Sequence, residues 1–247
     1  MTSAVAVRDL HYAYPDGTVA LNGVTLSIEP GERVAVLGPN GAGKTTLMLH
    51  LNGLISAERG SVEIAGLRLD DDTTAEIRRR VGLVFQDPDD QLFMPTVADD
   101  VAFGPANQGV KGVDLAQRVD AALAAVGMQE VAARPPHHLS LGKRRRVAVA
   151  TVLSMDPELL VLDEPSSNLD PASRREVAEV LLGLGRTIVM VTHDLPYALQ
   201  LCPRSVILSE GRIVADGPTG DLLADPAMLA RHRLELPFGF DPATVTA

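Results

Sequence analysis

Tryptophan is absent from the 247-residue chain, and Cys202 is its only cysteine. A single cysteine cannot form an internal disulfide, which favours a reducing compartment. No apolar run approaches the roughly 18 residues that a membrane-spanning helix needs. The first residues, MTSAVAVRDL, also lack the basic start and apolar stretch of a secretory signal. We therefore expect a soluble protein, or one held at a membrane by a partner.

Basic residues are too few to balance the acids, because 22 lysines and arginines face 32 aspartates and glutamates, a formal net charge of −10. This sign argues against a general nucleic-acid binder. The composition, 46% hydrophobic and 22% charged, is that of a globular protein. The length allows one large or two small domains.

The hydrophobic pattern predicts an α/β fold. Residues 4–37 read as several strands, separated by the turn signals YPDG and EPGE. LLVLD (159–163) and TIVMVTH (187–193) are apolar without alternation, as in parallel strands that helices cover on both faces. Residues from about 87 to 158 have a helical pattern instead. We expect a parallel sheet with N-terminal strands and an inserted helical segment.

A glycine-rich loop follows the short predicted strand RVAVL and opens a helix. In such loops the backbone N–H groups and the helix N-terminus face phosphate oxygens. Lys44 is expected to bridge the β- and γ-phosphates, and the Thr45 hydroxyl to bind Mg²⁺. The alternative, a strand-to-helix turn without a ligand, is disfavoured by this strand-loop-helix context. The predicted ATP-binding residues are Gly38, Pro39, Asn40, Gly41, Ala42, Gly43, Lys44, Thr45 and Thr46.

Two acids end the predicted strand LLVLD. Asp163 is placed to hold Mg²⁺. Glu164 points away from Asp163 if the strand continues, and could take a proton from a water that attacks the γ-phosphate. An Asp-Glu pair after a strand is ordinarily a helix cap or a turn. The phosphate loop upstream favours the catalytic interpretation here.

Gln86 and His193 also fall at the ends of predicted strands, where ligands lie in open α/β sheets. Each has a plain structural alternative. Gln86 could be a surface amide, and His193 a strand-end histidine capped by Asp194.

The segment LSLGKRRRVAVA (139–150) places four cations at the predicted start of a helix. A helix N-terminus carries partial positive charge and favours anions, so the cations Lys143 to Arg146 are unfavourable there by themselves. The segment alone leaves open what offsets this charge, and a solvated basic surface is one possibility.

Taken in order, these motifs resemble the ATP-binding-cassette (ABC) family over nearly the whole chain. The family's Q-loop residue matches Gln86, its Walker-B pair Asp163 and Glu164, and its switch histidine His193. Its signature matches Ser140, Leu141, Gly142 and Lys143, and its D-loop matches Ser167, Asn168, Leu169 and Asp170. Leu141 and Lys143 depart from the usual LSGGQ.

The resemblance implies one ATPase domain over residues 1–247, a P-loop NTPase of RecA-like type. It implies a core with an antiparallel β-subdomain at about 1–86 and 159–224, a helical subdomain at about 87–158 and a tail at 225–247. It also implies that Tyr14 stacks on adenine.

Catalytic roles implied by the resemblance fall on Glu164, His193 and Gln86, with Thr45, Gln86 and Asp163 as Mg²⁺ ligands. ATP and Mg²⁺ are the implied cofactors. In this family two subunits pack head to tail, so that the signature of one binds the γ-phosphate held by the other. We therefore expect a homodimer.

QDPDDQLFMPTVADDVAFGP, HHLSLGKRRRVAVATVLSM and RHRLELP resemble the energy-coupling-factor type of ATPase, particularly that of cobalt and nickel importers. This implies an integral membrane coupling protein and a substrate-capturing membrane protein as partners, at the cytoplasmic face of the membrane. Leu92, Phe93 and Met94 would form a docking groove, unless they belong to the helical core.

Three other functions stay open. A vitamin or another small molecule could be the cargo. A soluble cassette acting on ribosomes or DNA usually has two cassettes or long coiled coils. A P-loop small-molecule kinase would leave the signature and His193 unexplained.

Overall fold

The computed structural model describes residues 2–244 and divides them into two compact units. Unit 1 contains the residues up to Val81, Glu158–Glu164 and the residues from Arg186 onward. Unit 2 contains Gly82–Pro157 and Pro165–Gly185. Within the described residues, no helix combines the length and the apolar character needed to cross a membrane.

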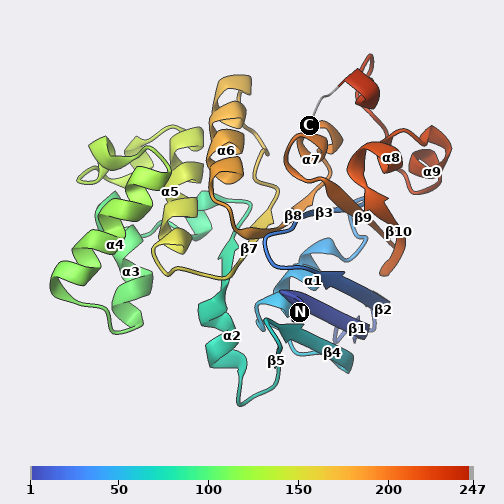
Figure 1. Ribbon diagram of the computed structural model, residues 1–247, viewed down its shortest axis with the longest axis horizontal. Helices are drawn as coiled ribbons and strands as arrows, with labels where there is room; N and C mark the ends of the chain where they lie inside the picture. The colour runs from blue at the N-terminus through green and yellow to red at the C-terminus, as the bar shows by residue number, and fades with distance from the viewer. Residues whose placement is uncertain (1, 245–247) are drawn as a thin grey trace. The chain divides into compact units, whose positions relative to one another are not determined.

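Most strands belong to unit 1 (Figure 1). Its elements are β1 (Val5–Ala13), β2 (Val19–Ile28), β3 (Arg33–Leu37), α1 (Lys44–Leu51), β4 (Arg59–Ile64), β5 (Leu67–Arg68), α2 (Thr74–Arg80), β7 (Leu159–Asp163), β8 (Thr187–Thr192), α7 (Leu195–Leu201), β9 (Arg204–Ser209), β10 (Arg212–Pro218), α8 (Thr219–Leu223), α9 (Pro226–Arg231) and the 3₁₀ turn η4 (Pro242–Thr244). Strand β6 (Val81–Val84) begins in unit 1 and continues into unit 2.

Unit 2 is helical. Its elements are α3 (Val97–Asn107), α4 (Gly112–Ala125), α5 (Leu141–Leu153), α6 (Pro171–Gly183) and the 3₁₀ turns η1 (Pro88–Asp90), η2 (Gln129–Val131) and η3 (Pro136–His138). Helices α3, α4 and α5 pack on one another, and α5 also packs on α6 (Figure 1). Gly142 permits this last contact, because a Cβ there would lie 2.5 Å from Ser173 Oγ. The helical subdomain expected at about 87–158 did not include α6. In the structure α6 packs on α5 and belongs to unit 2.

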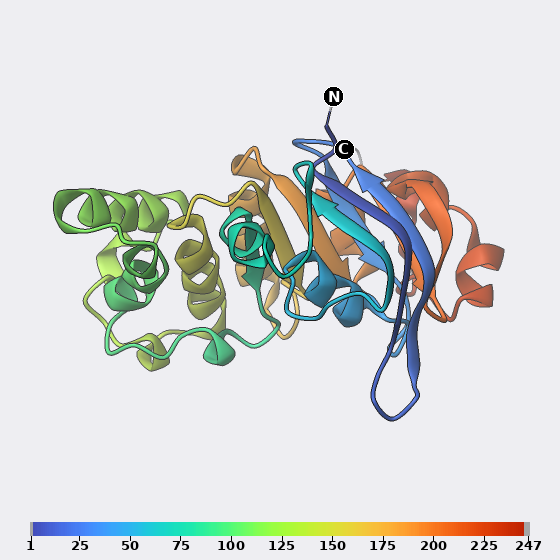
Figure 2. The same cartoon turned by 90° about the horizontal axis from the view of Figure 1, so that it is seen from below.

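The smaller sheet is antiparallel, with strand order β2-β1-β4-β5. Val5 pairs with Ile28 on one side and with Ile64 on the other, so that alternate residues meet on one buried face. The β1–β2 hairpin is the long blue loop that extends from this sheet in Figure 2. The predicted N-terminal antiparallel sheet is confirmed.

The larger sheet has the strand order β10-β9-β3-β8-β7-β6. Strand β8 runs parallel to β3 on one side and to β7 on the other. Every residue of β7 and β8 is buried, which explains their apolar runs without alternation. Leu37 pairs with Thr192, and Asp163 pairs with Val191. The carboxyl ends of β3, β8 and β7 therefore lie side by side at one edge of the sheet.

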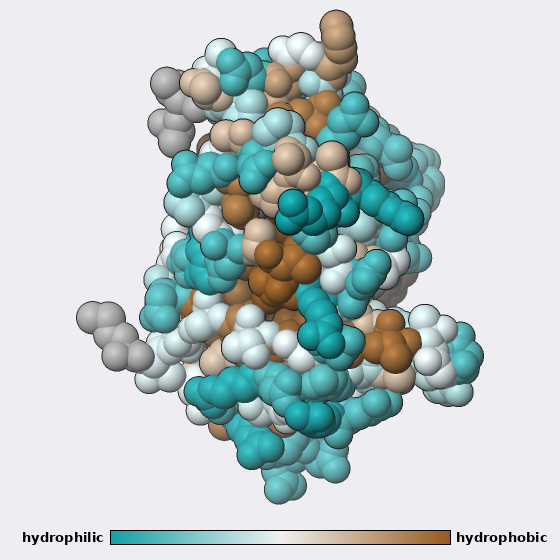
Figure 3. All heavy atoms as spheres, turned by 90° about the vertical axis from the view of Figure 1, so that its right-hand side faces the viewer, coloured by the Kyte–Doolittle hydropathy of each residue, from teal (hydrophilic) through white to brown (hydrophobic). Residues whose placement is uncertain are grey.

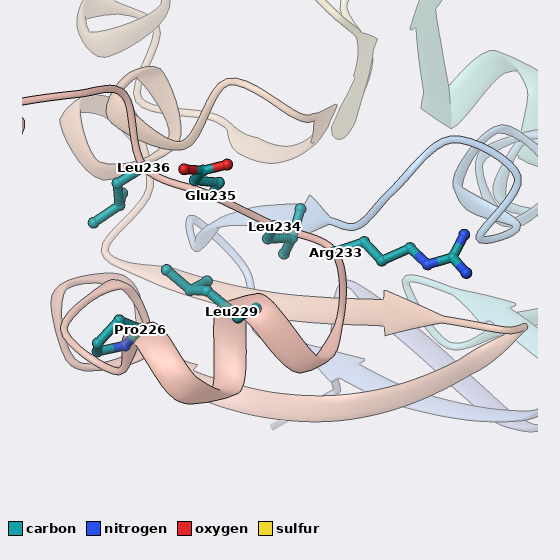
Figure 4. Close-up of a pocket in the computed structure, with 7 residues that line it drawn as sticks. Pro226, Leu229, Arg233, Leu234, Glu235 and Leu236 are labelled. Atoms are coloured by element: carbon teal, nitrogen blue, oxygen red, sulfur yellow. The ribbon is translucent and has the colours of Figure 1, made fainter.

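The C-terminal segment forms a groove of about 640 Å³ between α9 and the residues that follow it. Leu229, Arg233 and Leu236 are among the residues that line this groove, and Figure 4 shows the long Arg233 side chain extending to the right. Figure 3 looks onto the side of unit 1 that carries α8, α9 and β10, and shows hydrophobic side chains between hydrophilic ones. Phe238, two residues beyond the groove, is fully exposed.

Candidate nucleotide-binding site

The glycine loop joins β3 to α1, and its geometry requires glycine at both ends. A Cβ at Gly38 would lie 2.2 Å from the Leu208 carbonyl oxygen, and one at Gly43 would lie 2.3 Å from that of Ala20. Gly41 and Gly43 also have φ values of 79° and 102°, which other residues rarely adopt. The loop thus packs closely on neighbouring backbone, with the N-terminus of α1 directly behind it.

Lys44, the first residue of α1, is buried and folded over this loop. Its Nζ donates to the carbonyl oxygens of Gly38 at 2.7 Å and Pro39 at 3.0 Å. Burial lowers the pKa of the Lys44 ammonium, while the negative charges of Glu164 and Asp163 oppose that shift. The lysine, the loop and both acids therefore share one electrostatic site in unit 1.

Tyr14 begins the β1–β2 turn and reaches α1. Its hydroxyl hydrogen-bonds the Thr46 hydroxyl at 2.9 Å, and its ring meets Tyr12 edge to face with centroids 5.3 Å apart. The ring remains partly exposed. Tyr14 is thus a neighbour of the glycine-loop helix rather than only a residue flanking a turn.

The two acids diverge at the end of β7. Asp163 is the last residue of the strand and is buried, whereas Glu164 has a φ of 46° and leaves the strand. This left-handed conformation costs a non-glycine residue about 1–2 kcal/mol. The Glu164 backbone N–H donates to the Val191 carbonyl oxygen at 2.8 Å. Glu164 therefore does not continue the strand, and its side chain turns towards the end of β8.

The Glu164 carboxylate is held by three donors. Oε2 accepts from the Thr192 hydroxyl at 2.8 Å. Oε1 accepts from the His193 backbone N–H at 3.0 Å and from His193 Nδ1 at 2.6 Å. A carboxylate has no proton to give, so Nδ1 carries the hydrogen. The His193 side chain is 61% exposed, whereas that of Glu164 is only 9% exposed.

The Asp194 carboxylate accepts from the Tyr197 backbone N–H at 3.1 Å and caps α7. The partner of His193 Nδ1 is Glu164, so His193 is more than a capped strand-end residue. Thr192 was not a predicted site residue. Its place beside a predicted strand-end histidine was a signal, but nothing in the sequence showed that Glu164 turns towards it.

Mg²⁺ usually needs only one or two protein oxygens in addition to substrate phosphates. Within residues 2–244 no cluster of three or more His, Cys, Asp or Glu residues has a metal-binding arrangement. The exposed Thr45 hydroxyl and the Asp163 carboxylate are both in unit 1 and fit the smaller requirement. Gln86 lies in unit 2, exposed and two residues beyond the end of β6.

The signature residues open helix α5 as expected. Ser140 is its N-cap and is exposed, but the Ser140 hydroxyl makes no capping hydrogen bond. Leu141 is half-buried, Gly142 is buried against α6, and Lys143 is exposed. Ser140 and Lys143 are thus the exposed signature residues at the start of α5.

Arg145 is a buried cation, 1% exposed, whose guanidinium binds backbone carbonyl groups. Its guanidinium donates to the carbonyl oxygens of Phe85 and Gln86, and to that of Ser167 at 3.3 Å. It therefore ties the start of α5 to the Q-loop and to the D-loop inside unit 2.

The neighbouring arginines also have partners in the chain. Arg144 pairs with Asp89 and Arg146 with Glu176, each at 2.9 Å. The family resemblance implied an anion outside the chain for this segment, with some of the arginines facing solvent or neighbouring acids. Three of the four cations have partners within the chain, and Lys143 is the exposed one.

The D-loop residues lead into α6. Asp170 is its N-cap and accepts from the backbone N–H groups of Ala172 and Ser173 at 3.0 Å. The Ser173 hydroxyl and these amides hold the pKa of Asp170 below its usual value. Asn168, with a φ of 60°, turns the chain just before this cap.

Unit 1 thus brings the glycine loop, Lys44, Asp163, Glu164 and His193 to one edge of a mostly parallel sheet. This combination defines a P-loop nucleotide-binding domain. The ABC transporter family model matches residues 21–167. The chain belongs to this family of ATP-hydrolysing transporter subunits.

Proteins of similar sequence support this family membership. A putative ABC transporter ATP-binding protein of Streptomyces avermitilis is 68% identical over 240 residues, 97% of this chain and 92% of the relative. The energy-coupling factor transporter ATP-binding protein EcfA of Carboxydothermus hydrogenoformans is 47% identical, over 96% of this chain and 88% of the relative.

Among solved structures, CbiO1 of Clostridium perfringens, part of the ABC transporter complex CbiONQ, superposes with a TM-score of 0.85. It is 36% identical and covers 94% of each chain. The resemblance to energy-coupling-factor and CbiO-type ATPases, and the predicted P-loop fold, are therefore confirmed.

Arg145→Met should lower the free energy of unfolding by about 1–3 kcal/mol, because buried carbonyl groups lose a charged donor. Lys143→Met is the matched control, since Lys143 is exposed on the same helical turn. Urea unfolding of both variants measures the difference. Equal stability of the two variants would contradict the bracing role of Arg145.

Proposed function

We propose that this chain is the ATP-hydrolysing subunit of an energy-coupling-factor importer whose cargo is a transition-metal ion such as cobalt. The similarity to EcfA and to CbiO1 supports this. The observation that carries hydrolysis is the Glu164 carboxylate, fixed at the same sheet edge as the glycine loop. A vitamin importer remains the second candidate, supported by the same EcfA similarity.

In this proposal, Lys44 leaves the loop carbonyls to bind the β- and γ-phosphates, and Tyr14 stacks on adenine. Thr45 and Asp163 would hold Mg²⁺, with Gln86 as the third proposed ligand, and the bound ion would supply positive charge that offsets the charge of the phosphates. Glu164 Oε2 accepts one hydrogen bond, from Thr192, and so keeps a lone pair that can take the proton of the attacking water. His193, free to rotate, moves from Glu164 to the γ-phosphate.

The complete site forms between two copies. One chain supplies the glycine loop, and its partner supplies Ser140 and the α5 N-terminus, so that a two-fold axis generates two equal sites. The exposed hydroxyl of Ser140 and the exposed ammonium of Lys143 support this arrangement. Phe238 and the groove near Leu229 and Leu236 would add a further contact between the subunits.

Glu164→Gln should trap this dimer with ATP bound, because the amide preserves shape but no longer accepts a proton. We expect ATP hydrolysis to fall by about 10²–10⁴. Sedimentation with ATP and Mg²⁺ should then show a dimer.

Adding Ser140→Arg to Glu164→Gln should abolish the trapped dimer, since a bulky side chain blocks the γ-phosphate. Nucleotide binding to the monomer should persist, because Ser140 acts on the partner's ATP. A double variant that still dimerises with ATP, or that loses nucleotide as a monomer, would show that Ser140 has another role.

The surface proposed to receive a helix of the membrane coupling protein is narrower than expected. Leu92 is buried in unit 2 and belongs to its core, which corrects the expectation that it lines a docking groove. Phe93 is 61% exposed and meets Phe103 edge to face with ring centroids 5.0 Å apart. Asp100 Oδ1 accepts from the backbone N–H groups of Phe93 and Met94, each at 3.0 Å, and so fixes this loop.

Phe93→Asp should abolish association with the membrane partner without changing ATP affinity, because the Phe93 ring lies outside the core. Val113→Asp, at an exposed position on α4 of the same unit, is the control. Co-purification with the membrane subunits and nucleotide titration measure the two effects. Insoluble Phe93→Asp protein beside soluble Val113→Asp would instead assign Phe93 to the core.

The cargo is tested in cells that carry Glu164→Gln in place of the native chain. They should lose energy-dependent uptake of radioactive cobalt, since the cargo moves only when ATP is hydrolysed. Uptake of a labelled vitamin by the same cells is the comparison. Loss of vitamin uptake with cobalt uptake intact would favour the vitamin importer over the metal importer.

A further inference from the structure

We propose that Thr192 is a positioning residue for ATP hydrolysis. Its hydroxyl keeps the Glu164 carboxylate in place when the His193 side chain leaves that carboxylate during the cycle. This inference rests on the proposed role of Glu164 as the base. Three features support it: the direction of the Thr192 hydroxyl hydrogen, the fixed place of Thr192 in the sheet, and the contrast with His193.

The Thr192 hydroxyl has a defined direction. Its Oγ1 accepts from the Asp194 backbone N–H at 3.0 Å. Because that amide only donates, the hydroxyl hydrogen of Thr192 is left for Glu164 Oε2, 2.8 Å away. The bond is therefore oriented towards the carboxylate and favours one rotamer of the Glu164 side chain.

The position of Thr192 is fixed by the sheet. It is the last residue of β8, between β3 and β7, and it pairs with Leu37, the residue that precedes the glycine loop. Thr192 is fully buried, and its branched Cβ restricts the rotation of its side chain. Its hydroxyl thus ties the geometry of Glu164 to the strand that carries the phosphate loop.

His193 holds the other oxygen of the same carboxylate in a different way. Its side chain is largely exposed, so the imidazole can rotate away from Oε1. When it does, the Thr192 hydroxyl and the His193 backbone N–H remain. The two side-chain contacts therefore divide into one that can be released during the cycle and one that stays.

Thr192→Val removes the hydroxyl with little change of volume. We expect kcat for ATP to fall about tenfold to hundredfold, as small misplacements of a reacting group do. KM and the dissociation constant for ATP should change less than about twofold, because Thr192 is not among the predicted phosphate ligands. Thr192→Ser, which keeps the hydroxyl, should restore most of kcat.

Thr187→Val is the matched control at the opposite end of β8. Thr187 is also buried, and its hydroxyl accepts from the Gly31 backbone N–H at 2.9 Å. Its loss should lower stability but leave kcat unchanged. An equal loss of kcat in Thr187→Val and Thr192→Val would mean that removing any buried hydroxyl from β8 lowers kcat. That result would overturn the proposal.

A double-mutant cycle separates action through Glu164 from other effects. In a Glu164→Gln background, Thr192→Val should cause little further loss of the residual rate. Losses that multiply would overturn the proposal. If Thr192→Val does not fold, Thr192→Ala in the same cycle replaces it. Wild-type kcat in the Thr192 variants overturns the positioning role alone, whereas wild-type kcat in Glu164→Gln overturns the proposed base.

Discussion

The parallel pairing of β8 with β3 and β7 is the constraint on which the site in unit 1 depends. These strands carry the glycine loop, the Thr192–His193 pair and the Asp163–Glu164 pair, and their register brings the three strand ends to one edge. Because the strands are buried on both faces, a slip in register by one residue would turn each side chain to the opposite covered face and disrupt its packing. The same burial that stabilises the sheet therefore also fixes the relative positions of the chemical groups.

The basic segment at the start of α5 shows how a charge pattern can have two causes at once. Arg145 is buried among carbonyl oxygens of the Q-loop and D-loop, and Arg144 and Arg146 pair with acids of unit 2. These contacts offset the unfavourable charge at a helix N-terminus without any external anion. Only the exposed Lys143 and the free N-cap hydroxyl of Ser140 are left to meet one. The anion-binding interpretation thus rests on two residues rather than on the whole cluster.

The pattern of hydrophobic residues and the turn signals in the sequence predicted much of the fold. The strands LLVLD and TIVMVT appear at their expected places, since uniform apolarity over a short run is a local signal. The site was predicted less completely. The turn at Glu164 depends on a left-handed φ and a hydrogen bond to Val191, and the role of Thr192 follows from that turn. Such contacts join residues 28 apart in the chain, and no local pattern encodes them.

Glu164 also shows why donors of unequal freedom suit a hydrolytic cycle. A base that is held by mobile groups alone would lose its orientation whenever those groups moved to the substrate. One held entirely by fixed donors could not exchange contacts as phosphate arrives and leaves. A buried threonine followed by an exposed histidine satisfies both needs. Strand β8 is buried on both faces and keeps the Thr192 side chain inside the protein, whereas His193 lies just beyond the end of the strand. The difference in freedom between the two donors thus follows from the end of β8 at Thr192.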